Sequence, residues 1–184
     1  MTEQSIRRAT ERDADLLAEL GATTFYESFA AQNTPENMTA YLAATFVPEQ
    51  QRAELADPRN TFLIAENDGV AIGYAHLRTG KPPACVSDPN AIELVRLYVS
   101  STLQGSGIGG RLMDACLTEA RRSGYQTIWL GVWQQNTRAQ AFYNRWNFSK
   151  VGEHVFQLGD DRQMDWLMER SLYLCAKSHL TGLT

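Results

Sequence analysis

The sequence has few of the features that mark a membrane or secreted protein. No run of about 18 apolar residues occurs in its 184 residues, so no membrane span is expected. The opening residues, "MTEQSIRR", lack the apolar core of a secretory signal. We therefore expect a soluble, cytoplasmic protein that does not bind a membrane.

Basic residues and cysteines are also scarce. Lys and Arg number 17 against 21 Asp and Glu, giving a net charge of −4, which argues against a nucleic-acid partner and suits a cationic substrate. The three cysteines, Cys85, Cys116 and Cys175, are odd in number and far apart. This spacing indicates neither a disulfide framework nor a zinc site, and we expect no metal.

The chain length suits one domain over residues 1–175, followed by a tail over 176–184 that we expect to be poorly ordered. Apolar periodicity and turn residues predict helices over 13–30, 34–46, 48–57, 107–124 and 136–147, and strands over 5–9, 60–67, 69–78, 91–99, 126–133, 148–159 and 162–174. Because helices and strands do not alternate strictly, the pattern favours an α+β fold with a mixed sheet.

Four glycines fall within six residues at "GSGIGG", residues 105–110, between a strand pattern and a helix pattern. So many glycines are costly in a plain turn, and the position indicates phosphate bound at a helix N-terminus. The spacing G-x-G-x-x-G fits a dinucleotide site, but the turn lies deep in the chain and the following strand ends without an acid. A nucleoside triphosphate loop would need a lysine where Arg111 stands. A pyrophosphate held by backbone N–H groups remains, with an unliganded helix-entry turn as the plain alternative.

The residues around this turn carry a family resemblance. Gln104-x-x-Gly107-x-Gly109 resembles the Q/R-x-x-G-x-G/A motif of GCN5-related N-acetyltransferases (GNAT). The preceding "ELVRLYV" and the later "NTRAQAFY" match the same family in the same order. The segments "TFYESFAAQNTPENMTAYL", "IWLGVWQQN" and "GEHVFQLGDDRQMDWLM" look like Pai-type spermidine/spermine N-acetyltransferases. One departure is Asn147, where the family usually has glycine; asparagine also tolerates a left-handed C-cap.

The resemblance implies a GNAT fold, with a central, mixed, mostly antiparallel sheet of about seven strands flanked by helices. It also implies direct transfer of acetyl from acetyl-CoA, the cosubstrate, to a primary amine of a small cationic acceptor such as spermidine or spermine. Two alternatives stay open. One is an acetyltransferase for a protein N-terminus, a lysine, an amino acid or an antibiotic amine; the other is a CoA-binding regulatory protein without catalysis. Family members commonly dimerise, which leaves a homodimer open.

The resemblance assigns acetyl-CoA binding to three segments. The pyrophosphate is expected at the backbone N–H groups of Gln104, Gly105, Ser106, Gly107, Ile108, Gly109 and Gly110. The pantetheine arm is peptide-like and can pair with an exposed strand edge at Leu97, Tyr98 and Val99. Asn136 could bond the same arm, or it could simply cap the short helix.

Two residues are candidates for proton transfer. Tyr143 matches the family's general acid, and a phenol of pKa about 10 is a suitable donor to a departing thiolate. Glu93 is the candidate base, acting directly or through a water molecule, with an ion pair to Arg96 as the structural alternative. Strict strand alternation would place Glu93, Val95 and Leu97 on one face and Arg96 on the other, unless a bulge intervenes.

Acceptor contacts are expected from an acidic and aromatic lining, which cations prefer. The candidates are Tyr26, Glu27, His154, Asp160 and Asp161. For Asp160 and Asp161 the alternative is an ordinary turn, and for His154 a structural role.

Overall fold

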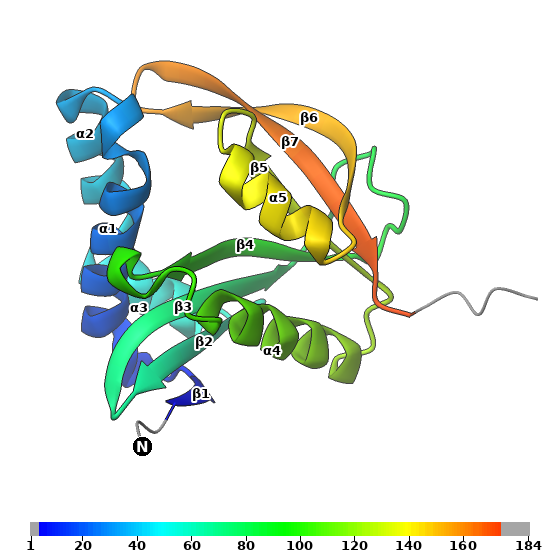
Figure 1. The fold of residues 1–184 in the computed structure, drawn as a ribbon, viewed down its shortest axis with the longest axis horizontal. Helices are drawn as coiled ribbons and strands as arrows, with labels where there is room; N and C mark the ends of the chain where they lie inside the picture. Colours follow the sequence, from blue (N-terminus) through cyan, green and yellow to red (C-terminus); the bar gives the residue numbers. More distant parts are fainter. Residues whose placement is uncertain (1–3, 174–184) are drawn as a thin grey trace, which may run out of the picture.

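The computed structural model describes residues 4–173, so the tail predicted over 176–184 lies outside the described residues. Seven strands form one sheet in the order β1-β2-β3-β4-β5-β7-β6 (Figure 1). Every neighbouring pair is antiparallel except β4 and β5. The predicted α+β class, with a mostly antiparallel sheet of seven strands, is confirmed.

The strands and helices follow the predicted periodic segments closely. The strands are β1 (Gln4–Arg8), β2 (Asn60–Asn67), β3 (Val70–Thr79), β4 (Ile92–Val99), β5 (Thr127–Trp133), β6 (Ser149–Leu158) and β7 (Asp161–Ser171). The α-helices are α1 (Ala14–Phe29), α2 (Pro35–Thr45), α3 (Pro48–Ala56), α4 (Ile108–Arg122) and α5 (Thr137–Arg145). Within residues 4–173, no helix is both long and apolar enough to cross a bilayer.

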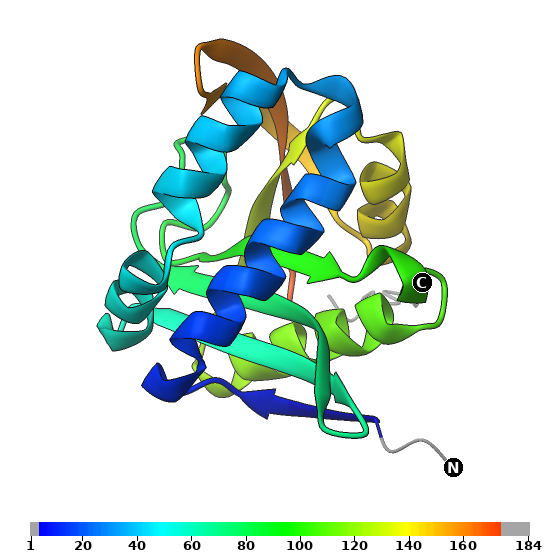
Figure 2. The same cartoon turned by 90° about the vertical axis from the view of Figure 1, so that its left-hand side faces the viewer.

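Helices cover both faces of the sheet. Helix α4 packs on β2, β3 and β4, while α1 and α3 lie on the opposite face of the same strands (Figures 1 and 2). The main core lies under α4, where Leu112, Met113 and Cys116 are fully buried against the strands. Helix α5 lies on the α4 side and adds Phe142 and Tyr143 to this core.

Capping and turn residues define where several of these elements begin and end. The Thr34 hydroxyl accepts a hydrogen bond from the Asn37 N–H at 3.3 Å, and Pro35 opens α2. Asp68 and Gly69 have φ of 50° and 78°, as the tight turn between β2 and β3 requires. Asn147 has φ of 61°, so it serves as the left-handed cap in place of glycine.

Strand β4 contains a bulge that corrects the predicted alternation. His76 pairs with Arg96, but the next residue of β3, Leu77, pairs with Leu94, which leaves Val95 as the extra residue. Beyond Val95 the facing of β4 side chains is therefore inverted. Arg96 shares the α1 and α3 face with Glu93, whereas Leu97 packs with Leu94 in the α4 core.

The parallel contact between β4 and β5 is very short. Only Ile92 with Ile128 and Glu93 with Trp129 are in register. Beyond these pairs the two strands diverge, and β5 continues its pairing with β7 on its other side through Trp133. The later half of β4 therefore has no strand neighbour on that edge.

Gly73 tests how tightly β3 and β4 approach each other. A Cβ at Gly73 would lie 2.7 Å from the Tyr98 carbonyl oxygen and 3.2 Å from the Val99 Cα. We expect Gly73→Ala to lower the free energy of unfolding by about 1–3 kcal/mol, because backbone atoms must move. Chemical denaturation measures this. Gly80→Ala is the control, since nothing lies within 4 Å of its added Cβ, and an equal loss there would contradict the explanation.

Candidate active site

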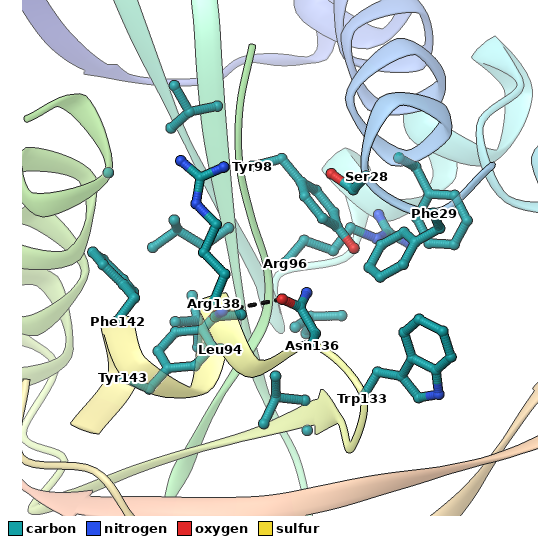
Figure 3. Close-up of a pocket in the computed structure, with 18 of the residues that line it drawn as sticks. Ser28, Phe29, Leu94, Arg96, Tyr98, Trp133, Asn136, Arg138, Phe142 and Tyr143 are labelled. Carbon is teal, nitrogen blue, oxygen red and sulfur yellow. Dashed lines mark hydrogen bonds between the residues drawn. The ribbon is translucent and has the colours of Figure 1, made fainter. Parts of the chain in front are cut away.

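A cavity of about 740 Å³ opens where β4 and β5 diverge. Its walls come from β4, β5, the glycine turn, α1, α5 and the β6–β7 hairpin. Figure 3 shows Phe142 and Tyr143 on one side of it and Phe29 and Trp133 on the other. The residues of the three motifs noted in the sequence therefore meet at one site.

The glycine turn leads into α4 through two residues in the left-handed region of backbone conformation. Gly105 and Gly107 have φ of 90° and 91°, and Gly107 is the N-cap of α4. The first N–H groups of a helix have no partner within it, so those of Ile108, Gly109 and Gly110 face outward from the helix end. The Ser106 N–H instead donates to the Leu103 carbonyl at 3.2 Å, inside the turn.

The residues around the turn fall into two groups, those that line the cavity and those that do not. Gln104, Gly105, Gly107, Gly109 and Gly110 line the cavity, as do Leu97, Tyr98, Val99 and Asn136. Ser106 is exposed outside it, and the Ile108 side chain is buried in the core. An added Cβ at Gly109 or Gly110 would still lie 3.6 Å or more from its neighbours. Close packing therefore does not require these two glycines, and they leave open the space that a ligand would fill.

Two arginines that sequence reasoning missed stand beside the turn. Arg138 and Arg145 of α5 both line the cavity, and Arg138 donates to the Gln104 side-chain oxygen at 2.5 Å. Gln104 in turn donates to the Val99 carbonyl at 3.3 Å. The two arginines are seven residues apart, which places them on one helix face, and that spacing was the available signal.

Asn136 is the N-cap of α5. Its side-chain oxygen accepts a hydrogen bond from the Ala139 N–H at 3.0 Å (Figure 3). The capping alternative is therefore confirmed, and the side-chain NH₂ remains the group that could bond a pantetheine arm.

Tyr143 lies on α5 with its ring against Phe142 and Phe148. The side chain is partly buried at the cavity wall, and desolvation there raises the pKa of the phenol above its ordinary value. A raised pKa keeps the phenol protonated, which is the form a general acid needs.

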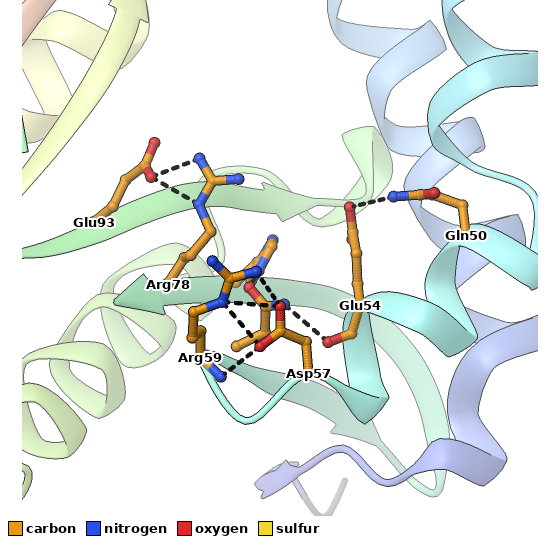
Figure 4. A network of polar contacts seen from close by, with 8 residues as sticks. Gln50, Glu54, Asp57, Arg59, Arg78 and Glu93 are labelled. Atoms are coloured by element: carbon orange, nitrogen blue, oxygen red, sulfur yellow. Dashed lines mark hydrogen bonds and ion pairs between the residues drawn. The ribbon is translucent and has the colours of Figure 1, made fainter. Parts of the chain in front are cut away.

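Glu93 is paired with Arg78, not with Arg96. The Arg78 guanidinium donates to Glu93 Oε2 from Nε at 3.0 Å and from Nη2 at 2.7 Å (Figure 4). Arg96 is bound by Glu54 of α3, at 2.8 Å and 3.3 Å. The predicted ion pair between Glu93 and Arg96 is therefore wrong. Arg78 of β3 binds Glu93, and Glu54 of α3 binds Arg96. Both bonds from Arg78 go to Oε2, so Oε1 receives none from this arginine.

The predicted acceptor residues are only partly brought together. Glu27 and His154 line the cavity, and Glu27 also accepts the Ser101 N–H at 3.0 Å. Tyr26 is 55% exposed and does not line the cavity. Asp160 and Asp161 lie at the β6–β7 turn outside it; the Asp160 N–H donates to Asn37 and the Asp161 carboxylate accepts from Gln163. This position agrees with the turn alternative for both.

Asp165 is a cavity residue that the sequence did not reveal. It lies on β7 opposite His154 of β6, with 3.6 Å between Asp165 Oδ2 and His154 Nε2. Burial raises the pKa of Asp165, while the nearby imidazole acts in the opposite direction. Asp165 within the alternating segment "RQMDWLME" carries no local sign of a cavity residue. The register between β5, β7 and β6 decides where its side chain points.

Aromatic rings complete the wall near Asp165. The ring centroids of Phe29 and Trp133 lie 6.2 Å apart, and those of Tyr41 and Phe156 lie 5.6 Å apart.

Among residues 4–173, no three His, Cys, Asp or Glu side chains converge in a way that could hold a metal ion.

Comparison with known sequences identifies this arrangement. Residues 22–148 match the acetyltransferase (GNAT) family. The chain belongs to this family. An uncharacterized N-acetyltransferase from the pepI 3′ region of Lactobacillus delbrueckii subsp. lactis is 33% identical over 172 residues, covering 94% of this chain and 99% of the relative. An uncharacterized N-acetyltransferase of Mycobacterium tuberculosis is 35% identical over 160 residues, covering 87% of this chain and 98% of the relative.

Solved structures share the GNAT fold. The PaiA N-acetyltransferase of Thermoplasma acidophilum, in complex with coenzyme A, superposes with a TM-score of 0.72 at 21% identity, covering 92% of this chain and 99% of that one. YncA, a putative acetyltransferase from Salmonella typhimurium with acetyl-CoA, gives a TM-score of 0.64 at 22% identity, covering 93% and 95%. The expected GNAT fold, N-acetyltransferase class and acetyl-CoA cosubstrate are thereby confirmed.

Substitutions of two glycines at opposite ends of α4 can distinguish an effect on ligand binding from an effect on backbone conformation. Gly107 and Gly124 have φ of 91° and 82°, and neither has an atom within 4 Å of an added Cβ. We expect each change to alanine to cost about 1–2 kcal/mol of unfolding free energy.

Only Gly107→Ala should also weaken the binding of acetyl-CoA, because it displaces the N–H groups at the cavity. We expect the Kd to rise tenfold or more, which corresponds to a loss of about 1.4 kcal/mol of binding free energy. Calorimetric titration with acetyl-CoA measures the difference. Equal affinity in the two variants would contradict a phosphate site at this turn.

Proposed function

We propose that this GNAT enzyme transfers acetyl from acetyl-CoA directly to a primary amine of a small cationic acceptor such as spermidine or spermine. One observation carries the proposal. The two ends of a single cavity bear opposite charge, and the splayed strand β4 runs between them.

The positive end fits the pyrophosphate of CoA. It combines the N-terminus of α4 with Arg138 and Arg145. Neither arginine has a carboxylate partner among the ion pairs of the described residues. Both charges and the helix-end N–H groups are thus available to phosphate.

The negative end fits a cationic amine. The carboxylates of Glu93 and Asp165 line it, together with the aromatic rings of the opposite wall, whereas Glu27 accepts the Ser101 N–H beside the glycine turn. The arginines on this side, Arg78 and Arg96, are each bound by a carboxylate. Asp165 has no arginine partner among the ion pairs of the described residues, so its carboxylate remains to attract a cation, and the rings add a surface that cations favour.

Between the two ends, the residues suit direct transfer. The unpaired edge of β4 at Leu97, Tyr98 and Val99 offers backbone groups to a peptide-like arm and an N–H to the thioester oxygen as it gains charge. Glu93 Oε1 takes a proton from the acceptor's ammonium group, directly or through a water molecule. The neutral amine then forms the C–N bond at the thioester carbon, and the C–S bond breaks to release the CoA thiolate. The Tyr143 phenol donates its proton to the departing thiolate.

An amine panel tests the acceptor class. Purified protein with acetyl-CoA is offered spermidine, spermine, a peptide with a free N-terminus, a lysine peptide and an aminoglycoside, with thiol release and product mass as readouts. We expect the polyamines to give the highest kcat/KM. Preference for a peptide or an antibiotic would overturn the polyamine assignment, and CoA binding without turnover on any amine would favour the regulatory alternative.

Tyr143→Phe tests the proposed acid. Loss of the hydroxyl should lower kcat by about 10²–10⁴-fold, since no other group then protonates the thiolate, while acetyl-CoA affinity stays close to that of the wild type. Tyr125→Phe, which removes a hydroxyl from a residue packed against the same core outside the cavity, is the control. A parallel loss of affinity and kcat would assign Tyr143 to binding and packing instead.

A further inference from the structure

The carboxylate of Asp165 is set up differently from the other carboxylates of the cavity. Its side chain is only 13% exposed and lies in mid-strand, where an uncompensated charge is costly. Glu93 receives two hydrogen bonds from an arginine, and Glu27 accepts the Ser101 N–H. The ion-pair partner of Asp165 in the described structure is His154, which is a weaker and pH-dependent counter-ion.

Gly131 provides open space beside this carboxylate. It lies on β5, two residues before Trp133, which is in register with Asp165, so the two residues share one face of the strand. An added Cβ at Gly131 would lie 3.4 Å from both Asp165 Oδ2 and His154 Nε2. Although Gly131 is inside a central strand, it is exposed, because the cavity lies above it.

The walls around this point suit a cation. The sheet register places Trp133, His154 and Phe156 on the face that carries Asp165, and all of them line the cavity. The ring of Phe29 of α1 contacts that of Trp133 across the opening. A carboxylate surrounded by aromatic rings over an open floor is a typical site for an alkylammonium group.

We infer that Asp165, beside His154 and above Gly131, binds a second ammonium group of the acceptor, so that the enzyme selects diamines and longer polyamines over monoamines. The reacting amine lies near Glu93 on the β4 side of the cavity, while the second ammonium lies on the β5–β7 side. This inference rests on the proposed function and adds a residue that determines specificity.

The test compares two acceptors of equal chain length, 1,4-diaminobutane and butylamine, with acetyl-CoA and the full chain. The wild type should acetylate the diamine with the higher kcat/KM. Asp165→Asn should reduce the ratio of diamine to monoamine kcat/KM by about 10- to 100-fold, mainly through KM, because the lost contact is a charge-assisted one. Asp114→Asn, which removes the same charge from an exposed position on α4, should leave the ratio unchanged.

A second variant tests the same site without removing the carboxylate, so the result does not depend on whether Asp165→Asn folds. Gly131→Ala retains the carboxylate and fills the floor beside it, so it should reduce the same ratio while acetyl-CoA affinity stays unchanged. A wild-type enzyme that acetylates both amines equally, or variants that lower both activities alike, would overturn the second-ammonium site and leave the proposed function standing. An enzyme that acetylates no amine would overturn the proposed function, and this inference with it.

Discussion

The short parallel contact between β4 and β5 is the constraint on which the rest of the site depends. Two residue pairs join the strands, and beyond Glu93 and Trp129 they separate. Backbone N–H and C=O groups inside a sheet are normally paired, so the free edge of β4 is open to an extended, peptide-like ligand. The cavity, the glycine turn at the end of β4 and the wall of β5 all take their positions from this divergence.

The bulge at Val95 makes the divergence compatible with a packed core. By inverting the facing of the later residues, it directs Arg96 toward α3, where Glu54 binds it in a largely buried ion pair. Such a pair is costly to break, since either partner alone would be a buried, uncompensated charge. The bulge also lets Leu97 follow Leu94 into the core under α4. Strand β4 is therefore held on both faces while one edge stays free.

The sequence predicted those features that local chemistry determines. Helix caps, the tight turn at Asp68 and Gly69, the left-handed Asn147 and the glycine turn before α4 all follow from the preferences of one to four neighbouring residues. The partners of Glu93 and the exposure of Asp165 depend instead on the register between distant strands. A single bulged residue moves every later side chain of the strand to the opposite face, and valine at position 95 has no preference that predicts a bulge.

For the proposed reaction, the same divergence explains how one cavity would serve two ligands of opposite charge. A polyanion and a polycation bound together must be kept apart everywhere except where they react. The helix-end N–H groups and the arginines of α5 lie at one end, and the carboxylate of Asp165 lies on β7 at the other. Arg78 and Arg96, which also line the cavity, are each paired with a carboxylate, so they add no free positive charge beside Asp165. An amine that loses its proton to Glu93 is neutral when it attacks, and the charge pattern then favours the reaction over simple ion pairing.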